Sequence, residues 1–208
     1  MIYILIRHGE SEQNIGNANG MIDPNIPLTD YGLNQADKLG QYIYMNRKEL
    51  GIDNSSILFF SPYMRTQETK NKILEKNNYI TFCNEEILLT EIQCGDFTGY
   101  TMKQYSELNP MEYEKFMLYK KNMSRFWYKY PNGESPFDVS IRANSFLQKV
   151  SICNSTVVIV SHFHVLKVLQ MLLMSENLEW YEHESGKSNC EMRIIENGQL
   201  LQSIQFNL

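Results

Sequence analysis

The chain has 208 residues, of which 43% are hydrophobic and 21% are charged, a composition that excludes a disordered or fibrous protein. The net charge of −5 weighs against general nucleic-acid binding, and the apolar opening 1–6 is too short for a membrane span or a signal-peptide core. We therefore expect one cytoplasmic domain, 1–208, that binds neither nucleic acid nor membrane, and the sequence leaves a homodimer open.

Short runs of Ile, Val, Leu and Phe predict strands that are covered on both faces, because their hydrophobicity is continuous rather than alternating. Helical patterns follow the first two of these runs, and the third lies between two helical segments. The predicted strands are 3–6, 57–60, 79–83, 157–160 and 190–195. The predicted helices are 29–46, which Thr29 caps, 64–77 and 165–174. This order predicts an α/β three-layer sandwich with a mostly parallel central sheet flanked by helices.

Polar side chains that can take part in chemistry follow three of the predicted strands, at the point where each strand ends. Arg7 and His8 follow the first, Arg65 comes shortly after the second, and His162 follows the fourth. Ligands bind outside the carboxyl ends of strands in an open parallel sheet, so we expect these four side chains to converge. Two guanidinium groups suit a tetrahedral dianion, and a neutral imidazole is a competent nucleophile toward phosphorus. The pattern therefore favours phosphoryl transfer.

Each of these residues also has an ordinary structural interpretation. A single histidine after a strand is more often a hydrogen-bonded structural group, and Arg65 alone would suit a surface ion pair. A metal site is a further alternative, because His162 and His164 stand two residues apart. No nearby cluster of acidic residues or histidines supplies the remaining ligands, so we predict that the protein holds no metal.

Six spaced segments together resemble the histidine phosphatase superfamily, in the branch that includes cofactor-dependent phosphoglycerate mutases and small phosphatases. The resemblance runs nearly from end to end. The segments are "LIRHGESEQN" (5–14), "PLTDYGLNQADKLG" (27–40), "SPYMRTQET" (61–69), "LLTEIQCGDFTG" (88–99), "PNGES" (131–135) and "VVIVSH" (157–162). The resemblance implies a phosphoglycerate mutase-like fold, with His8 as the residue that becomes phosphohistidine and with Arg7 and Arg65 as phosphate ligands.

The resemblance also implies roles for three further residues. Glu91 would be the acid that protonates the leaving oxygen, so we expect a pKa above that of an ordinary glutamate. His162 would be a cationic third donor to the phosphate, and Asn14 would donate another hydrogen bond or serve only as a turn residue. The family usually has glycine where this chain has Phe163, so we expect a strained loop or a narrower pocket there.

The segment 100–130 departs from its surroundings in charge. Six basic and three acidic residues give 101–130 a charge of +3 within a protein of −5. One prediction is a helical insertion that covers the active site and favours multiply charged or ring-bearing phosphate esters. The alternative is an amphipathic helix pair with a solvated charged face.

These observations together predict a metal-independent phosphomonoester hydrolase that acts through phosphohistidine on His8. The enzyme would be a phosphatase of the histidine acid phosphatase type, would need no cofactor and would act on a small-molecule phosphate ester. The runner-up is a cofactor-dependent phosphoglycerate mutase, although the region after Gly99 does not match the mutase insertion. A non-catalytic phospho-ligand binder is the third alternative.

Overall fold

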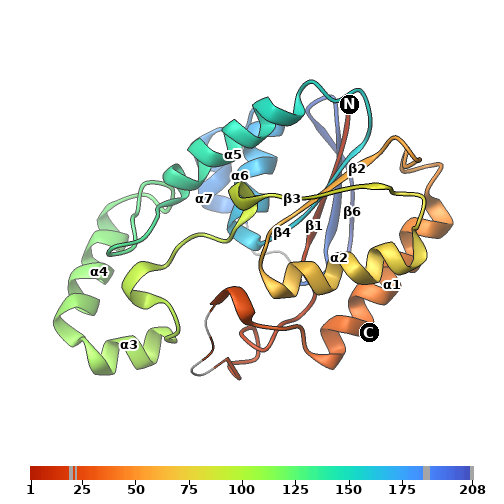
Figure 1. Ribbon diagram of the computed structural model, residues 1–208. Coiled ribbons are helices and arrows are strands. Elements are labelled where there is room, and N and C mark those ends of the chain that lie inside the picture. Colours follow the sequence, from red (N-terminus) through yellow and green to blue (C-terminus); the bar gives the residue numbers. More distant parts are fainter. Residues whose placement is uncertain (19–20, 22, 185–187, 207–208) are drawn as a thin grey trace.

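A computed structural model describes residues 1–18, 21, 23–184 and 188–206. Its centre is a six-stranded sheet in the order β3-β2-β4-β1-β5-β6 (Figure 1). The strands β1 to β4 pair in parallel, whereas β5 runs antiparallel to β1 and β6 antiparallel to β5. The strands are β1 (Ile2–Arg7), β2 (Ile57–Phe60), β3 (Phe82–Glu85), β4 (Val157–Ser161), β5 (Met192–Glu196) and β6 (Gln199–Ile204). The predicted mostly parallel sheet is confirmed.

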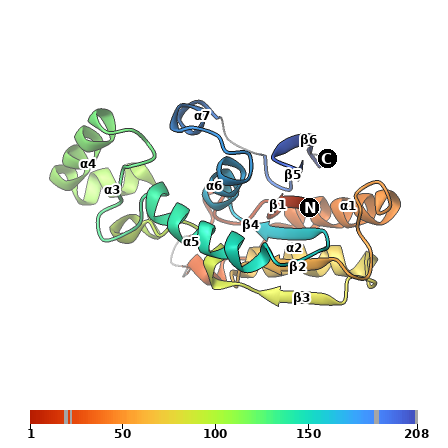
Figure 2. The ribbon, with the colours of Figure 1, turned by 90° about the horizontal axis from the view of Figure 1, so that it is seen from above.

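Helices cover both faces of this sheet, as the view from above shows (Figure 2). The helices are α1 (Asp30–Asn46), α2 (Met64–Lys76), α3 (Met102–Leu108), α4 (Pro110–Asn122), α5 (Pro136–Val150), α6 (Phe163–Leu173) and α7 (Leu178–His183). Short 3-10 turns occupy Asp23–Asn25, Ile87–Leu89 and Gly95–Phe97. In the described part of the chain, every helix falls short of the length and apolar character that crossing a bilayer requires.

The continuous hydrophobicity of the central strands serves two separate cores. Ile4 and Ile6 of β1 pack with the helices α1 and α2, whereas Leu5, between them, packs with α5 and α6. Successive side chains of a strand point to opposite faces, so both faces of β1 must be apolar when both are covered. The three-layer α/β sandwich predicted from the sequence is therefore the fold that the chain adopts.

The helix boundaries follow the expected capping chemistry. The hydroxyl oxygen of Thr29 accepts a hydrogen bond from the backbone amide of Gly32 at 3.0 Å, which satisfies one of the donors that the first turn leaves unpaired. α5 begins with a capping box, in which Ser135 and Asp138 each bond the other's backbone amide, and Pro136 occupies the first turn. The predicted helices 29–46, 64–77 and 165–174 are thus present within two residues at each boundary.

Two predicted strands start later than their apolar patterns indicated, and one strand was not predicted. Tyr79 and Ile80 form the turn after α2, where Ile80 packs into the core, so β3 begins only at Phe82. Cys190 adopts a positive φ of 56° and donates its amide to the carbonyl oxygen of His8, so β5 begins at Met192. The last strand, β6, was missed because its side chains are mostly exposed and give no apolar alternation.

The helical segment α3–α4 lies at one end of the molecule, away from the sheet (Figures 1 and 2). A separate small cluster of buried rings joins it to the loops beside it: Phe97, Tyr105, Phe116 and Tyr128. Phe97 stacks on Tyr105 with ring centroids 3.8 Å apart. The segment is therefore anchored by aromatic contacts of its own rather than by either of the two main cores.

A close backbone approach fixes the loop after β1 against the first turn of α1. A Cβ atom added at Gly9 would lie 2.5 Å from the carbonyl oxygen of Gly32, and one added at Gly32 would overlap the carbonyl oxygen of Glu10. Such distances leave no room for a side chain at either position. These two glycines therefore set the position of the backbone that carries His8.

We predict that Gly32→Ala destabilises the protein by about 2 kcal/mol, because the added methyl group must displace backbone rather than a flexible side chain. Alanine favours helix by about 1 kcal/mol over glycine, so an unobstructed site would show the opposite sign. Urea unfolding followed by circular dichroism measures the change. Asn34→Ala, at an exposed position of the same helix, is the control and is expected to be neutral or slightly stabilising. Equal or greater stability in Gly32→Ala would contradict the packing described here.

Candidate active site

The ends of the parallel strands bring together the side chains that the sequence placed there. Arg7 at the end of β1 pairs in register with Ser161 at the end of β4. The next residues, His8 and His162, face each other with ring centroids 5.2 Å apart. Arg65, from the first turn of α2, lies close enough to affect the electrostatics of both imidazoles. Two histidines and two arginines from three distant segments therefore share one site.

His8 is held in a defined tautomer. Its Nδ1 lies 2.7 Å from the carbonyl oxygen of Gly9. A carbonyl oxygen can only accept, so Nδ1 carries the proton and Nε2 carries the lone pair. Burial, together with the charges of Arg65 and Arg7, lowers the pKa of His8 well below its ordinary value. In the unliganded site His8 is therefore a neutral imidazole with an unprotonated Nε2, which is the form that can attack phosphorus.

The two arginines of the site have different surroundings, since Arg65 is buried and Arg7 is partly exposed. Arg65 is only 2% exposed and donates from one terminal nitrogen to the carboxylate of Asp23 at 2.9 Å. Its Nε is buried and has no hydrogen-bond partner. Burial lowers the pKa of Arg7 below its ordinary value, an effect that the carboxylates of Glu91 and Glu191 oppose. Both groups remain charged, so the site holds concentrated positive charge and at least one unused donor for an anion.

His162 is fully buried and is neutral in the unliganded site, which corrects the expectation of a cationic group. Burial and the charge of Arg65 lower its pKa well below the ordinary value. Its Nε2 lies 2.8 Å from the hydroxyl oxygen of Ser61, and its Nδ1 is buried without a partner. The tautomer in which Nε2 accepts from the Ser61 hydroxyl leaves Nδ1–H as a donor toward the site.

Glu91 lies at this site, but the expectation of a raised pKa is wrong for the unliganded protein. Burial alone would raise the pKa, yet His164, His162 and the backbone amide of Ile92 together outweigh it and lower the pKa of Glu91. His164 Nδ1 lies 3.5 Å from Glu91 Oε1, and the Ile92 amide donates to the same oxygen at 2.9 Å. The sequence could not place His164 beside Glu91, which is 73 residues earlier in the chain.

Asn14 is exposed and organises the loop after β1. Its Oδ1 accepts hydrogen bonds from Ser11 and from the side-chain amide of Asn189 at 2.9 Å. Asn189 also donates to the carbonyl oxygens of His8 and Gly9. These bonds give Asn14 a structural role in holding the His8 backbone. Its Nδ2, the donor group of the side chain, bonds no described residue.

Phe163, where the family usually has glycine, is the first residue of α6 and shows no strain. A helical conformation is available to any residue, so the expected backbone strain is absent. The ring lies 5.7 Å from the guanidinium carbon of Arg7, in the range of a cation–π contact. Phe163 therefore covers Arg7 on one side and narrows access to it, which was the other expectation for this position.

Two residues of the site carried no signal that sequence reasoning recognised. Asp23 neutralises Arg65 from a short 3-10 turn that belongs to no motif. Tyr63 places its ring 4.9 Å from the Arg65 guanidinium carbon and 5.1 Å from the His162 ring. Both contacts depend on the tertiary path of the chain, so the residue types alone could not have revealed them. Together they hold Arg65 and His162 in place.

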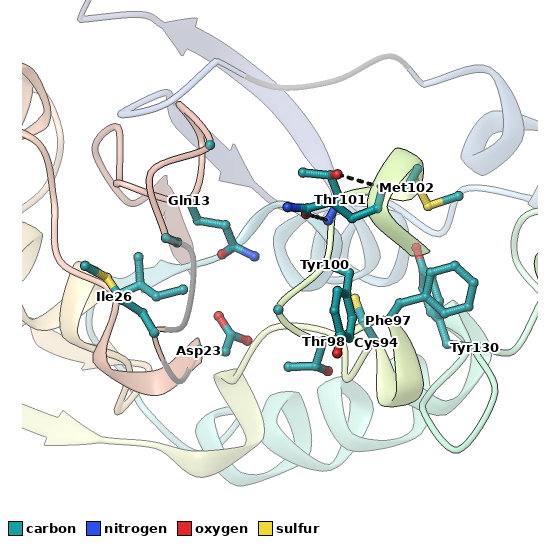
Figure 3. A pocket seen from close by; sticks show the side chains of 15 residues that line it. Gln13, Asp23, Ile26, Cys94, Phe97, Thr98, Tyr100, Thr101, Met102 and Tyr130 are labelled. Atoms are coloured by element: carbon teal, nitrogen blue, oxygen red, sulfur yellow. Dashed lines mark hydrogen bonds between the residues drawn. The ribbon is translucent and has the colours of Figure 1, made fainter. Parts of the chain in front are cut away.

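Two cavities flank the reacting side chains. The first, the Asp23 pocket, has about 330 Å³ and is lined by Gln13, Asp23 and Ile26 and by residues of 94–104. Figure 3 shows Gln13 and Asp23 on one wall and Thr98, Tyr100 and Tyr130 on the other. The second, the Lys167 pocket, has about 350 Å³ and is lined by Phe163, His164, Lys167 and residues of the segment 120–136. Tyr130 contributes to both cavities; Asp23 of the first is bonded to Arg65, and Phe163 of the second contacts Arg7.

Within the described residues, no three His, Cys, Asp or Glu side chains are gathered so that they could hold a metal ion. His162 and His164, the pair that raised the metal alternative, have other partners. His162 contacts Ser61, and His164 faces Glu91. The prediction that the reaction needs no metal therefore stays a prediction, to which these contacts add a defined role for each imidazole.

Comparison with known proteins shows the family to which the chain belongs. Residues 3–204 match the family described as the histidine phosphatase superfamily (branch 1). Phosphoglycerate mutase-like protein AT74 of Arabidopsis thaliana is 30% identical, with 94% of this chain and 65% of that protein aligned. Sedoheptulose 1,7-bisphosphatase of Saccharomyces cerevisiae is 24% identical, with 79% of this chain and 64% of that enzyme aligned. The chain therefore spans about two thirds of the length of these two relatives.

The fold is shared with solved structures as well. The crystal structure of the alpha-ribazole phosphatase from Shigella flexneri superposes with a TM-score of 0.76 at 22% identity, covering 94% of this chain and 90% of that one. At this identity the likeness is one of fold. The family match over nearly the whole chain is the stronger finding, and from it the protein belongs to the histidine phosphatase superfamily, branch 1.

Proposed function

We propose that the protein is a metal-independent phosphomonoester hydrolase that works through a phosphohistidine on His8. The observation that carries this proposal is the state of His8, whose buried ring is neutral and whose Nδ1–H is tied to the Gly9 carbonyl oxygen. This arrangement leaves one nucleophilic nitrogen, with the buried Arg65 and the partly buried Arg7 beside it. The nucleophilic nitrogen and the cations that would stabilise the phosphoryl group are thus both in place before a substrate binds.

The first half-reaction transfers the phosphoryl group to His8. The lone pair of Nε2 attacks phosphorus while the bond from phosphorus to the ester oxygen breaks, and that oxygen leaves with its electron pair. Arg7, Arg65 and the Nδ1–H of His162 offset the charge on the transferring group. The bound dianion raises the pKa of Glu91, because a negative neighbour disfavours the carboxylate. Glu91 can then deliver a proton to the leaving oxygen.

The second half-reaction returns the enzyme to its starting state. Glu91, now a carboxylate, accepts a proton from water as the water oxygen attacks phosphorus. The bond between phosphorus and Nε2 breaks, its electron pair returns to the imidazole, and inorganic phosphate leaves. His8 thereby regains its neutral form, which the hydrogen bond to Gly9 and the buried surroundings favour. The proton that Glu91 takes from solvent when the dianion binds returns to solvent as phosphate leaves, so no group other than water is consumed in the cycle.

A phosphoglycerate mutase is the second candidate, because the relative from Arabidopsis thaliana is described as phosphoglycerate mutase-like. A mutase must return the phosphoryl group to another oxygen of the same small molecule and must exclude water meanwhile. Two cavities of more than 300 Å³ border the reacting groups here. This supports hydrolysis, since water reaches an intermediate more readily where space adjoins it.

We expect His8→Ala to abolish phosphoenzyme formation and to slow p-nitrophenyl phosphate hydrolysis by about 10⁴-fold or more, the scale seen when a nucleophile is lost. Samples quenched in alkaline detergent, after reaction with a ³²P-labelled donor in the presence of EDTA, show whether a base-stable phosphoenzyme forms whose label is then lost on treatment with acid. His183→Ala, at an exposed position at the end of α7, is the matched control and should keep full activity. Undiminished turnover in His8→Ala would end the phosphohistidine proposal.

The same wild-type protein separates hydrolase from mutase. With 3-phosphoglycerate and a trace of 2,3-bisphosphoglycerate, a hydrolase releases inorganic phosphate and a mutase forms 2-phosphoglycerate. We expect release. Isomerisation at a rate far above phosphate release would replace the hydrolase proposal by the mutase, while leaving the role of His8 unchanged.

Arg65→Lys should lower kcat/KM by about 10²-fold, although the charge is retained. One lysine nitrogen can keep the contact with Asp23 or reach the phosphate, whereas the planar guanidinium does both. Steady-state kinetics with p-nitrophenyl phosphate measure the loss. Arg47→Lys, at an exposed position after α1, is the control that should change nothing. A near-wild-type rate in Arg65→Lys would mean that only net charge matters at this position.

His164→Gln should raise the pKa of Glu91, because the substitution removes the largest of the influences that hold that pKa down. Carbon-13 NMR of labelled glutamate, titrated without substrate, reads the carboxyl directly. If Glu91 is the acid, it stays protonated to higher pH, and the falling limb of activity against pH moves upward for alkyl phosphates. His183→Gln is the control. A pKa of Glu91 that stays constant or falls in His164→Gln would contradict the pairing.

A further inference from the structure

The turn 188–191, which directly precedes β5, touches the loop after β1 at the nucleophile. The backbone amide of Cys190 donates to the carbonyl oxygen of His8 at 3.0 Å. The carbonyl oxygen of Glu191 accepts from the backbone amide of Arg7, also at 3.0 Å. These two bonds fix the backbone of the two residues that would attack and bind the phosphoryl group.

The side chain of Asn189, in the same turn, reaches the peptide that orients the imidazole. Its amide nitrogen donates to the carbonyl oxygen of Gly9 at 3.2 Å. The same carbonyl oxygen accepts from Nδ1 of His8 at 2.7 Å, the contact that sets the tautomer of the ring. The tautomer of His8 therefore depends on where the turn 188–191 lies.

This turn has a backbone conformation that does not hold itself. Cys190 has a φ of 56°, in the left-handed region that favours glycine, and its side chain is fully buried. A residue other than glycine stays in this region only where its surroundings hold it there. The contacts on either side of Cys190 must therefore supply the constraint.

The carboxylate of Glu191 supplies much of this constraint. The residue is only 4% exposed. Its Oε2 accepts from the backbone amide of Ser188 at 3.1 Å, which closes the turn on itself. Its Oε1 accepts from the hydroxyl of Ser203 on β6 at 2.8 Å and from Nε of Arg193 on β5 at 2.5 Å. Both oxygens of a buried carboxylate thus join the turn to the two strands that follow it.

Arg193 extends these contacts to the helix that follows the second histidine. Its Nη1 donates to Oε1 of Gln170 at 2.6 Å and to Oε1 of Glu184 at 2.7 Å. Gln170 is 2% exposed and belongs to α6, which begins directly after His162. A planar guanidinium can hold three acceptors in fixed directions. One buried pair, Glu191 with Arg193, therefore connects the supports of both imidazoles.

Glu191 also has an electrostatic effect on the site. Burial lowers the pKa of Arg7, and the carboxylate of Glu191 is one of two that oppose this shift. A nearby negative charge favours the charged form of a guanidinium. The carboxylate that closes the turn thus also favours the charged state of a proposed phosphate ligand.

We propose that Glu191 is a positioning residue for phosphoryl transfer, and that Arg193 holds it in this role. The pair acts through the turn 188–191, which keeps the carbonyl oxygen of Gly9 where Nδ1–H of His8 donates to it. The kinetic part of this inference rests on the proposed function. The effect on the tautomer of His8 does not.

Substitution of the pair should slow turnover without weakening substrate binding. Glu191→Gln keeps the shape of the side chain, but one amide oxygen cannot accept both from Arg193 and from the Ser188 amide. We expect kcat for p-nitrophenyl phosphate to fall about 10-fold, because a displaced nucleophile reacts slowly, while KM changes by less than about 2-fold. Arg193→Lys should act in the same direction, since an ammonium group lacks the planar fork.

Two further variants give a milder change and a control. Ser203→Ala, at an exposed position of the edge strand, removes one contact of the carboxylate with little risk to folding, and should lower kcat by a smaller factor. Glu196→Gln, at the other end of β5, is the matched control and should leave kcat unchanged. Thermal unfolding followed by circular dichroism verifies that each variant is folded.

Nitrogen-15 NMR reads the tautomer directly in protein labelled at histidine. The chain has four histidines, so long-range correlations between nitrogen and carbon-bound protons resolve each ring, and the spectrum of His8→Ala assigns the His8 signals. We expect the single Nδ1–H tautomer in the wild type and in Glu196→Gln. Glu191→Gln and Arg193→Lys should show a measurable share of the Nε2–H tautomer, in which the attacking nitrogen carries a proton.

The two measurements together decide the proposal. A mixed tautomer of His8 together with a lower kcat supports it. A single Nδ1–H tautomer in every folded variant would overturn it, whatever the rates, and so would a mixed tautomer with unchanged kcat. A wild type that forms no phosphohistidine would end the proposed function instead, and the spectra would still show whether Glu191 and Arg193 set the tautomer of His8.

Discussion

The hydrogen bond from His8 Nδ1 to the carbonyl oxygen of Gly9 is the contact on which the rest of the site depends. It works only if the peptide after β1 stays in one place, and several segments hold it there. Thr69 of α2 accepts from the Gly9 amide at 3.1 Å, and the Cys190 amide and Asn189 side chain donate to the carbonyl oxygens of this stretch. The close approach of Gly32 completes the support. The neutral state and the orientation of the His8 imidazole thus depend on all the segments that meet at this edge of the sheet.

The second constraint is the concentration of buried positive charge. Arg65 and Arg7 lower the pKa of His8, so the cations that wait for a phosphate also keep the nucleophile unprotonated. Asp23 offsets Arg65, and Glu91 and Glu191 favour the charged form of Arg7. A phosphate dianion bound there would add a negative charge that raises the pKa of Glu91. Phosphate binding and the protonation of Glu91 are therefore coupled, because both depend on the same charges.

The sequence alone predicted the features that depend on residues close together in the chain. Continuous apolar runs predicted the central strands, and the residues that end them predicted where His8, His162 and Arg65 would meet. It failed where protonation depends on partners that are distant in sequence. The lowered pKa of Glu91 depends on His164, and the lowered pKa of His162 depends on burial and on Arg65. The spacing of these residues in the sequence does not predict those contacts. The exposed edge strand β6 was missed for a different reason, since a strand with one partner and solvent on its side chains has no apolar pattern.

The groups that choose a substrate come from different segments than the groups that perform the chemistry. The strand ends supply the imidazoles and most of the cationic groups, whereas the segment 94–136, which includes α3 and α4, supplies most of the lining of the Asp23 pocket and part of the lining of the Lys167 pocket. The fold matches that of an alpha-ribazole phosphatase at only 22% identity, so the fold itself cannot specify the leaving group. Because α3 and α4 rest on their own aromatic cluster, their side chains can change without disturbing either main core. The positive charge of this segment thus lies on the part of the fold that lines the cavities, next to a cluster of histidines and arginines that the sheet holds in place.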